Sequence, residues 1–140
     1  MDYKRFGNKI VLRLEKGDKV RESIREVAVK EDIKAAYFTG IGAVDKLKIG
    51  LFYPEKGDYT WDYYNEDMEV TSLVGNIGMV DGNQLVHTHI TCGRAKSEII
   101  GGHLDEATCS LTMEIFIDVI DGEIVKRLDP DLGINTIEFE

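Results

Sequence analysis

The sequence consists largely of short stretches that favour β-strands, separated by dipeptides that favour tight turns. Asp81-Gly82 and Asp121-Gly122 are the strongest of these turn signals, because such pairs accept the positive backbone angles of a two-residue hairpin. The first leads into Gln84–Thr91, which alternates apolar and polar side chains, and the second is predicted to lead into a further hairpin strand. A chain punctuated in this way is expected to fold mainly by pairing neighbouring strands in antiparallel fashion.

Further strands are predicted wherever apolar and polar residues alternate, or where β-branched and aromatic residues gather. These stretches are Lys9–Leu14, Ala35–Val44, Lys46–Tyr53, Tyr59–Asn65, Met68–Met79, Ser97–Leu104, Ala107–Ile120, Glu123–Leu128 and Ile134–Phe139.

One stretch shows helical spacing instead. Val20, Ile24 and Val27 recur along one face of a helix predicted over Lys19–Lys30, with Asp18 as its N-cap. Many antiparallel strands and one helix predict an α+β domain, built on a strongly curved antiparallel sheet with the helix packed on it. We expect residues 1–140 to form a single domain.

Composition excludes several classes of protein. The net charge is −9, from 26 acidic and 17 basic residues, which argues against a surface that neutralises nucleic-acid phosphates. No apolar segment resembles a signal peptide or is long enough to cross a bilayer. We therefore expect a soluble cytoplasmic protein without a membrane partner, in which Cys92 and Cys109 are free thiols.

All three histidines of the chain lie close together in the sequence. His87 and His89 form a His-x-His pair, which in an extended strand points both imidazoles to one face, roughly 7 Å apart at the backbone. His103 can join them if the chain doubles back into a second strand. Three imidazoles hold zinc or a similar divalent metal and leave one coordination position open, which is typical of catalytic zinc.

Convergence of the three side chains depends on the loop between the two strands. A two-residue loop at Gly93-Arg94 would put His103 on the face opposite to the other two histidines, because strand pairing fixes the face. An odd loop, or a bulge at Gly101-Gly102, restores the shared face. The metal hypothesis therefore predicts an irregular hairpin. The alternative is three ordinary, partly buried strand histidines.

An enzyme would need further groups beside the metal. Cys92 could add a soft ligand, although it falls at the predicted turn, and Cys109 fits an apolar core strand. The carboxylates close in sequence, each more simply explained as a surface group, are Glu69, Glu98, Asp105 and Glu114. None is assigned a catalytic role.

Four segments together resemble the PPC, or PCC, domain family, also called DUF296, in its stand-alone prokaryotic form. They are G-I-G-A-V at Gly40–Val44, M-E-V-T-S-L-V-G-N-I at Met68–Ile77, H-T-H at His87–His89 and G-G-H-L at Gly101–Leu104. The resemblance implies an α+β domain that assembles as a homotrimer. Plant relatives carry AT-hooks that bind DNA, and this chain has no R-G-R-P hook.

The implied fold is also similar to that of acetolactate decarboxylase, a zinc enzyme with a His-x-His pair and a further histidine. By that resemblance His87, His89 and His103 would be metal ligands. The leading hypothesis is a trimeric protein that holds zinc or another divalent metal, with a regulatory role. One alternative is a metal-dependent lyase or decarboxylase acting on a small carbonyl or carboxylate compound. The other is a DNA-associated regulator, which the acidic charge disfavours.

Overall fold

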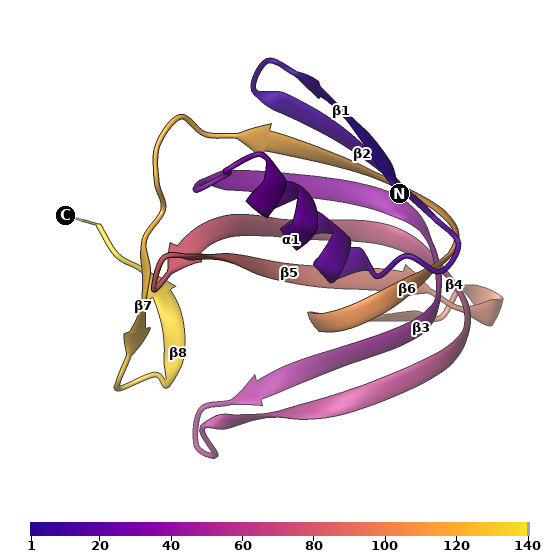
Figure 1. Cartoon of the computed structure of the whole chain (residues 1–140). Helices are drawn as coiled ribbons and strands as arrows, with labels where there is room; N and C mark the ends of the chain where they lie inside the picture. Colours follow the sequence, from indigo (N-terminus) through magenta and orange to yellow (C-terminus); the bar gives the residue numbers. More distant parts are fainter. Residues whose placement is uncertain (140) are drawn as a thin grey trace.

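The computed structural model describes residues 1–139 and confirms the α+β class, with eight strands, one α-helix and a short 3-10 helix in that range (Figure 1). The strands are β1 (Asp2–Phe6), β2 (Lys9–Glu15), β3 (Ala36–Tyr53), β4 (Asp58–Val80), β5 (Asn83–Gly93), β6 (Ile99–Val119), β7 (Lys126–Asp129) and β8 (Ile134–Ile137). The helices are α1 (Val20–Lys30) and η1 (Ala95–Ser97). No helix among the described residues is both long and apolar enough to span a membrane.

Three strands are much longer than the sequence pattern predicts. β3, β4 and β6 contain 18, 23 and 21 residues, and each joins two stretches that were predicted as separate strands. In β3 the pairing register shifts between Gly40 and Gly42 and again between Val44 and Lys46. Such bulges bend a strand and interrupt its alternation without ending it, so the pattern suggests a break where the chain only bends.

Gly42 shows why the first bulge needs a glycine. Its φ is +155°, and a Cβ there would lie 2.4 Å from the carbonyl oxygen of Thr112. Neither the backbone angle nor the space accepts a larger residue.

The main sheet curls back on itself through β5. Its order is β1-β2-β6-β3-β4-β5, all antiparallel, and β5 pairs in addition with the first residues of β6. β5 therefore lies between the second half of β4 and the first half of β6. This arrangement confirms the predicted strong curvature, visible in Figure 1 where the β3–β4 hairpin folds under the remainder of the sheet.

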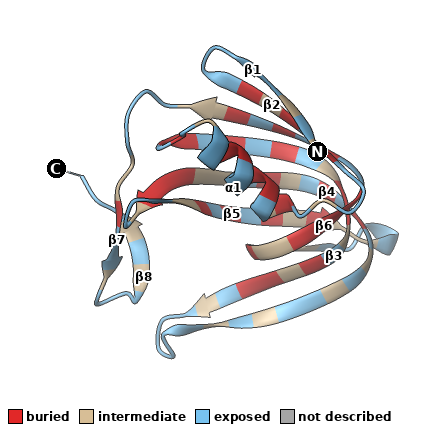
Figure 2. Cartoon of the chain, viewed as in Figure 1, coloured by how far each residue is buried: buried red, intermediate tan, exposed pale blue. Residues whose placement is uncertain are grey.

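The hydrophobic core lies between α1 and the sheet face that it covers. Val20, Ile24 and Val27 of α1 are fully buried, as their helical spacing predicts. β5 contributes alternate residues to this core, Val86 and Ile90 among them. Figure 2 shows buried residues along α1 and along the strands of the sheet. Each fully buried aliphatic side chain contributes about 1.5–3 kcal/mol. Because side chains alternate along a strand, the intervening residues of β5 face away from α1.

The N-terminus of α1 is not capped by Asp18, so that prediction is wrong. The helix begins at Val20, with Lys19 in the N-cap position and no side-chain cap there, while the Asp18 carboxylate accepts the backbone N–H of Glu15. A residue distant in sequence caps the helix instead. The spacing of nearby residues could not indicate such a contact.

That residue is Glu106 of β6. Its carboxylate accepts the backbone N–H groups of Arg21 at 2.8 Å and Glu22 at 3.1 Å. A carboxylate at this end of a helix satisfies unpaired donors and matches the positive end of the helix dipole. The contact also fastens α1 to the sheet.

The two predicted hairpin turns have different outcomes. Asp81-Gly82 joins β4 to β5 in a tight turn with positive φ at both residues, as predicted. Asp121-Gly122 does not turn β6 into a paired partner, because β7 pairs with β8. The chain crosses instead to β4, where the Met79 N–H donates to the Ile124 carbonyl at 2.7 Å.

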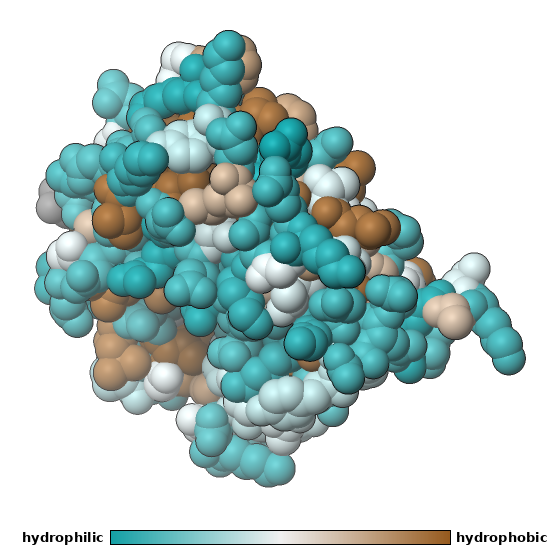
Figure 3. Space-filling model, turned by 45° about the vertical axis from the view of Figure 1, so that its right-hand side comes forward, coloured by the Kyte–Doolittle hydropathy of each residue, from teal (hydrophilic) through white to brown (hydrophobic). Residues whose placement is uncertain are grey.

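β1 was not predicted, because most of its side chains are exposed and do not alternate. On the face drawn in Figure 3, hydrophilic side chains cover most of the surface and hydrophobic ones show in patches between them. This distribution agrees with the highly charged composition.

Candidate metal centre

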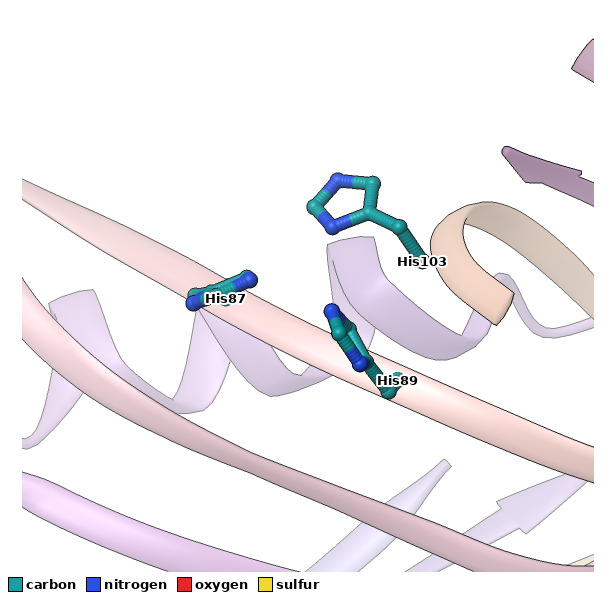
Figure 4. Close-up of side chains that lie close together, drawn as sticks. All are labelled: His87, His89 and His103. Atoms are coloured by element: carbon teal, nitrogen blue, oxygen red, sulfur yellow. The ribbon is translucent and has the colours of Figure 1, made fainter. Parts of the chain in front are cut away.

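The three histidines converge on the sheet face that points away from α1. His87 and His89 come from β5 and His103 from β6, and Figure 4 shows their rings turned toward one another. One ring nitrogen from each lies within 4.8 Å of the other two. The ring centroids are 5.2 to 5.5 Å apart. One ion can therefore take a nitrogen from each side chain.

The loop between β5 and β6 meets the condition for convergence. Gly93 pairs with Ile99, so the loop runs from Arg94 to Glu98 and has five residues, an odd number. His103 consequently lies opposite His89, on the same face.

The loop has its own local support. Lys96 and Ser97 both have a φ of +60°, a left-handed backbone that interrupts η1 and lets the chain reverse its direction tightly. The Arg94 guanidinium closes the loop by pairing with Glu66 at 2.6 Å and Glu98 at 2.7 Å. An Arg held between two carboxylates fixes the loop geometry through charge-assisted hydrogen bonds.

The bulge considered for Gly101-Gly102 is absent, since the β5–β6 register runs through both residues without a shift. The two glycines allow close approach of neighbouring strands. A Cβ on Gly101 would lie 2.7 Å from the Ile90 carbonyl oxygen, and one on Gly102 would lie 3.0 Å from that of Gly50. Both strands beside β6 can therefore approach it closely at the histidines.

His89 belongs to a row of paired residues that crosses the curled sheet from β2 onward on the face away from α1. Three strands contribute to this row twice, once from each half. In spatial order the row is Val11, Phe116, Thr39, Val74, His89, His103, Gly50 and Trp61. The histidines therefore lie where β5 joins the two halves of the sheet.

Aromatic side chains bound the site on the side of the folded-under β3–β4 hairpin. The ring of Tyr59 lies 4.8 Å from that of His103 and stacks on Trp61 at 4.9 Å. A Cβ on Gly50 would lie 2.8 Å from the Trp61 ring, so the indole rests directly on the strand. These contacts restrict the His103 ring and exclude water from that side.

The opposite side of the site opens into a pocket. Tyr37 and Asn76 line, together with His87 and His89, a pocket of about 340 Å³. Asn76 is the direct partner of His87 across β4 and β5, and its side-chain oxygen accepts a hydrogen bond from the Lys126 ammonium.

The environment favours neutral imidazoles. The pKa of His103 is lowered to about 4, first by burial and then by the neighbouring His87 and His89. The pKa of His87 is also lowered, first by desolvation among its neighbours although solvent reaches its ring, and then by Lys126 and His89. Metal ligation requires the neutral form, so these shifts suit a metal site.

One atom fits a metal directly. The Nδ1 of His103 is buried and has no hydrogen-bond partner among the described residues. An unpaired buried polar atom is costly, by about 1–3 kcal/mol, and a metal or an ordered ligand would offset that cost.

The other predicted candidates lie elsewhere. Cys92 points into the core on the opposite face of β5, where burial raises the pKa of its thiol to about 11. Cys109 is also buried in the core, as predicted. Asp105 pairs with Lys48 at 3.0 Å, and Glu98 pairs with Arg94 in the loop.

Neither Glu69 nor Glu114 belongs to the cluster that could hold a metal, which among the described residues consists of the three histidines alone. Asn76 and Lys126, which flank the site, were missed by the sequence analysis. Asn76 lies in the family-like segment Met68–Ile77 but was not singled out within it, and Lys126 reaches the site only through the C-terminal crossing.

Comparison with known proteins places the chain in a family. Residues 1–121 match the model of the Plants and Prokaryotes Conserved (PCC) domain. No curated protein matches the sequence. Among solved structures, a candidate DNA-binding protein from Bacteroides thetaiotaomicron is similar with a TM-score of 0.96 and 28% identity, covering 99% of this chain and 96% of that one.

Two archaeal structures are also similar. A PPC protein from Pyrococcus horikoshii has a TM-score of 0.87 and 28% identity, over 99% of this chain and 94% of that one. A metal-containing protein from Archaeoglobus fulgidus has a TM-score of 0.88 and 30% identity, over 99% of both chains. With the match over residues 1–121, the chain belongs to the Plants and Prokaryotes Conserved domain family.

Proposed function

We propose that the chain binds one divalent metal ion through His87, His89 and His103. The observation that carries the proposal is the approach of three ring nitrogens to within 4.8 Å of one another. The unpartnered Nδ1 of His103 supports it. So does the similarity to a metal-containing protein at 30% identity.

Zinc is the ion that suits these ligands best. Imidazole nitrogens favour zinc and its transition-metal neighbours over magnesium or calcium, which prefer oxygen. Three protein ligands leave at least one position open to water or a small molecule.

The metal content of protein purified without a histidine tag tests the proposal. We expect about one zinc ion per chain, retained after dialysis. His89→Ala and His103→Ala should each remove it, whereas Asn83→Ala, at the exposed start of β5, should not. A content near zero that added zinc does not raise would refute the proposal.

We also propose that the chain assembles as a homotrimer through the face that carries the histidines. Three large apolar side chains are exposed there: Tyr37 at 55%, Phe116 at 54% and Val74 at 48%. Monomeric proteins rarely leave such a group uncovered. Light scattering on protein that elutes from a size-exclusion column should give three times the mass of one chain. The Phe116→Glu variant should give a lower mass. A monomeric mass would contradict the assembly.

A metal-dependent enzyme is the second candidate function. The pocket beside His87 and His89 favours it, because a small carbonyl or carboxylate compound could reach an open metal position there. In cobalt-substituted protein, the visible spectrum reports the number of ligands on the metal. A spectrum of a four-ligand metal that does not change when small molecules are added would count against catalysis.

A regulatory role as a DNA-associated protein is less favoured. Its support is the description of similar proteins as candidate DNA-binding proteins, at 28% and 24% identity. The net charge of −9 opposes it. We expect no gel shift at low salt, and a shift that disappears with added salt would reverse this ranking.

We further propose that the protein acts in the cytoplasm. Its two cysteines are free thiols, which agrees with a reducing compartment.

A further inference from the structure

Lys126 is a buried lysine on the same sheet face as the histidines. Its side chain is only 4% exposed. The stem lies over Gly78 of β4, where a Cβ would come within 3.1 Å of the Lys126 Cε. Asn76, two residues earlier on β4, shares that face, and its side-chain oxygen accepts a hydrogen bond from the ammonium.

This contact links the ammonium to the histidine pocket through Asn76, which lines the pocket. Asn76 pairs directly with His87 across the two strands, and both residues line the same pocket. The charge of Lys126 is close enough to contribute to the lowered pKa of His87.

The ammonium lacks a compensating charge. Among the described residues no carboxylate lies within 4.0 Å of it, although buried lysines are nearly always paired. Asn76 can accept one of its three N–H donors. A desolvated cation with donors to spare, beside a metal site, is arranged to receive an anion.

We propose that the site binds a small carboxylate between the metal and Lys126. One carboxylate oxygen takes an open metal position, and the other accepts a hydrogen bond from the ammonium. The pocket of about 340 Å³ lies at the small end of the range for ligand sites and has room for a small carboxylate. One ammonium matches the single charge of a carboxylate, whereas phosphate sites normally offer more donors. This inference rests on the proposed metal binding, which supplies the first anchor.

Lys126 comes from the C-terminal segment of the chain. It lies beyond residue 121, where the match to the family model ends. It reaches the site because the segment after β6 crosses to β4, through the bond from the Met79 N–H to the Ile124 carbonyl.

Titration of the cobalt-loaded full chain with lactate tests the inference, with the visible spectrum as the readout and lactamide as the neutral analogue. Lactate should change the spectrum of the unmodified protein. Lys126→Met should weaken lactate binding about tenfold or more, as expected for the loss of a charge-assisted contact. The response to lactamide should be the same in both proteins.

Arg127→Met is the matched control, since Arg127 is the next residue of β7 and its side chain is exposed. It should bind lactate as the unmodified protein does. Lys126→Gln keeps a hydrogen-bond donor for Asn76 without the charge, and it should lose as much lactate affinity as Lys126→Met. It serves as the test variant if Lys126→Met does not fold.

Equal lactate affinity in Lys126→Met and unmodified protein would overturn the inference, as would a loaded protein that ignores lactate. Metal content is measured on every sample. A failure of metal binding is therefore recognised separately, and it would overturn the proposed function together with this extension of it.

Discussion

His89 of β5 lies directly opposite His103 of β6, so two of the three converging imidazoles form a cross-strand pair. His87 is two residues from His89 on the same strand and same face. The geometry of the cluster is therefore set by one strand's alternation and one pairing register. Anything that separates β5 from β6 at this pair should open the site.

Adding a side chain at Gly101 should have that effect. A Cβ there would lie 2.7 Å from the Ile90 carbonyl oxygen, so Gly101→Ala must push β5 and β6 apart. We expect a loss of about 1–3 kcal/mol in the free energy of unfolding, measured with urea, together with weaker metal binding.

Gly93→Ala is the control for this substitution. Gly93 lies in the same strand pair, but its added Cβ would meet only ordinary contacts at 3.8 Å or more, and its φ is not positive. This variant should be neutral or more stable by up to about 1 kcal/mol. Equal losses in both variants would show that close approach at Gly101 does not hold the site together.

Much of this arrangement could be predicted from the sequence, because it depends on local periodicity. The His-x-His spacing predicts a shared face, and parity shows that His103 joins it only across an odd loop or a bulge. The choice between those two could not be predicted. It depends on the left-handed backbone of Lys96 and Ser97 and on the Arg94 ion pairs that hold the loop.

The features that were missed depend on contacts between distant segments. Glu106 caps α1 from β6, and Lys126 reaches Asn76 after the chain crosses to β4. Neither residue type carries a local signal at its position. The sequence pattern predicted two strands in place of each long bent strand for a related reason. A bulge and a loop both interrupt the alternation of apolar and polar residues.

Trp61 should report metal binding. It is the single tryptophan of the chain, and its ring centroid lies 6.2 Å from that of His103. A paramagnetic ion held by the histidines would lie close to the indole. Cobalt should therefore quench the tryptophan fluorescence at about one equivalent, and a chelator should restore it.

His103→Ala should abolish this quenching, and Asn83→Ala, at the exposed start of β5, should preserve it. Full quenching in His103→Ala would mean that the ion binds elsewhere near Trp61.

Asp118 should make the stability of the protein depend on pH in the acid range. Its pKa is held below the usual 3.8 by hydrogen bonds from Lys9 and then from Tyr37, a residue of the histidine pocket. A carboxyl group whose pKa is lower in the folded state stabilises the protein above the unfolded value. That stabilisation is lost as pH falls below about 4 and through the folded pKa.

Asp118→Asn should therefore be less stable than the unmodified protein at neutral pH, and the difference should shrink as the pH falls toward 3. Urea denaturation across this range measures it. Asp62→Asn, at an exposed position of β4, should show no such trend. A difference that does not change with pH would contradict the role of the Asp118 charge.

Lys126 allows a test that separates a binding role from a structural one. Burial lowers the pKa of its ammonium, so folding holds this cation in an unfavourable environment. Replacing a buried ion pair by apolar side chains of similar volume is commonly neutral or stabilising by about 1–4 kcal/mol. Lys126 has no carboxylate partner among the described residues, so its replacement leaves no opposite charge unpaired. We therefore expect Lys126→Met to unfold at an equal or higher urea concentration than the unmodified protein. If the ammonium instead served to fasten the C-terminal segment through Asn76, the variant would lose stability and Asn76→Leu would lose a similar amount. A stable Lys126→Met that binds lactate poorly would identify a residue retained for its ligand at the expense of stability.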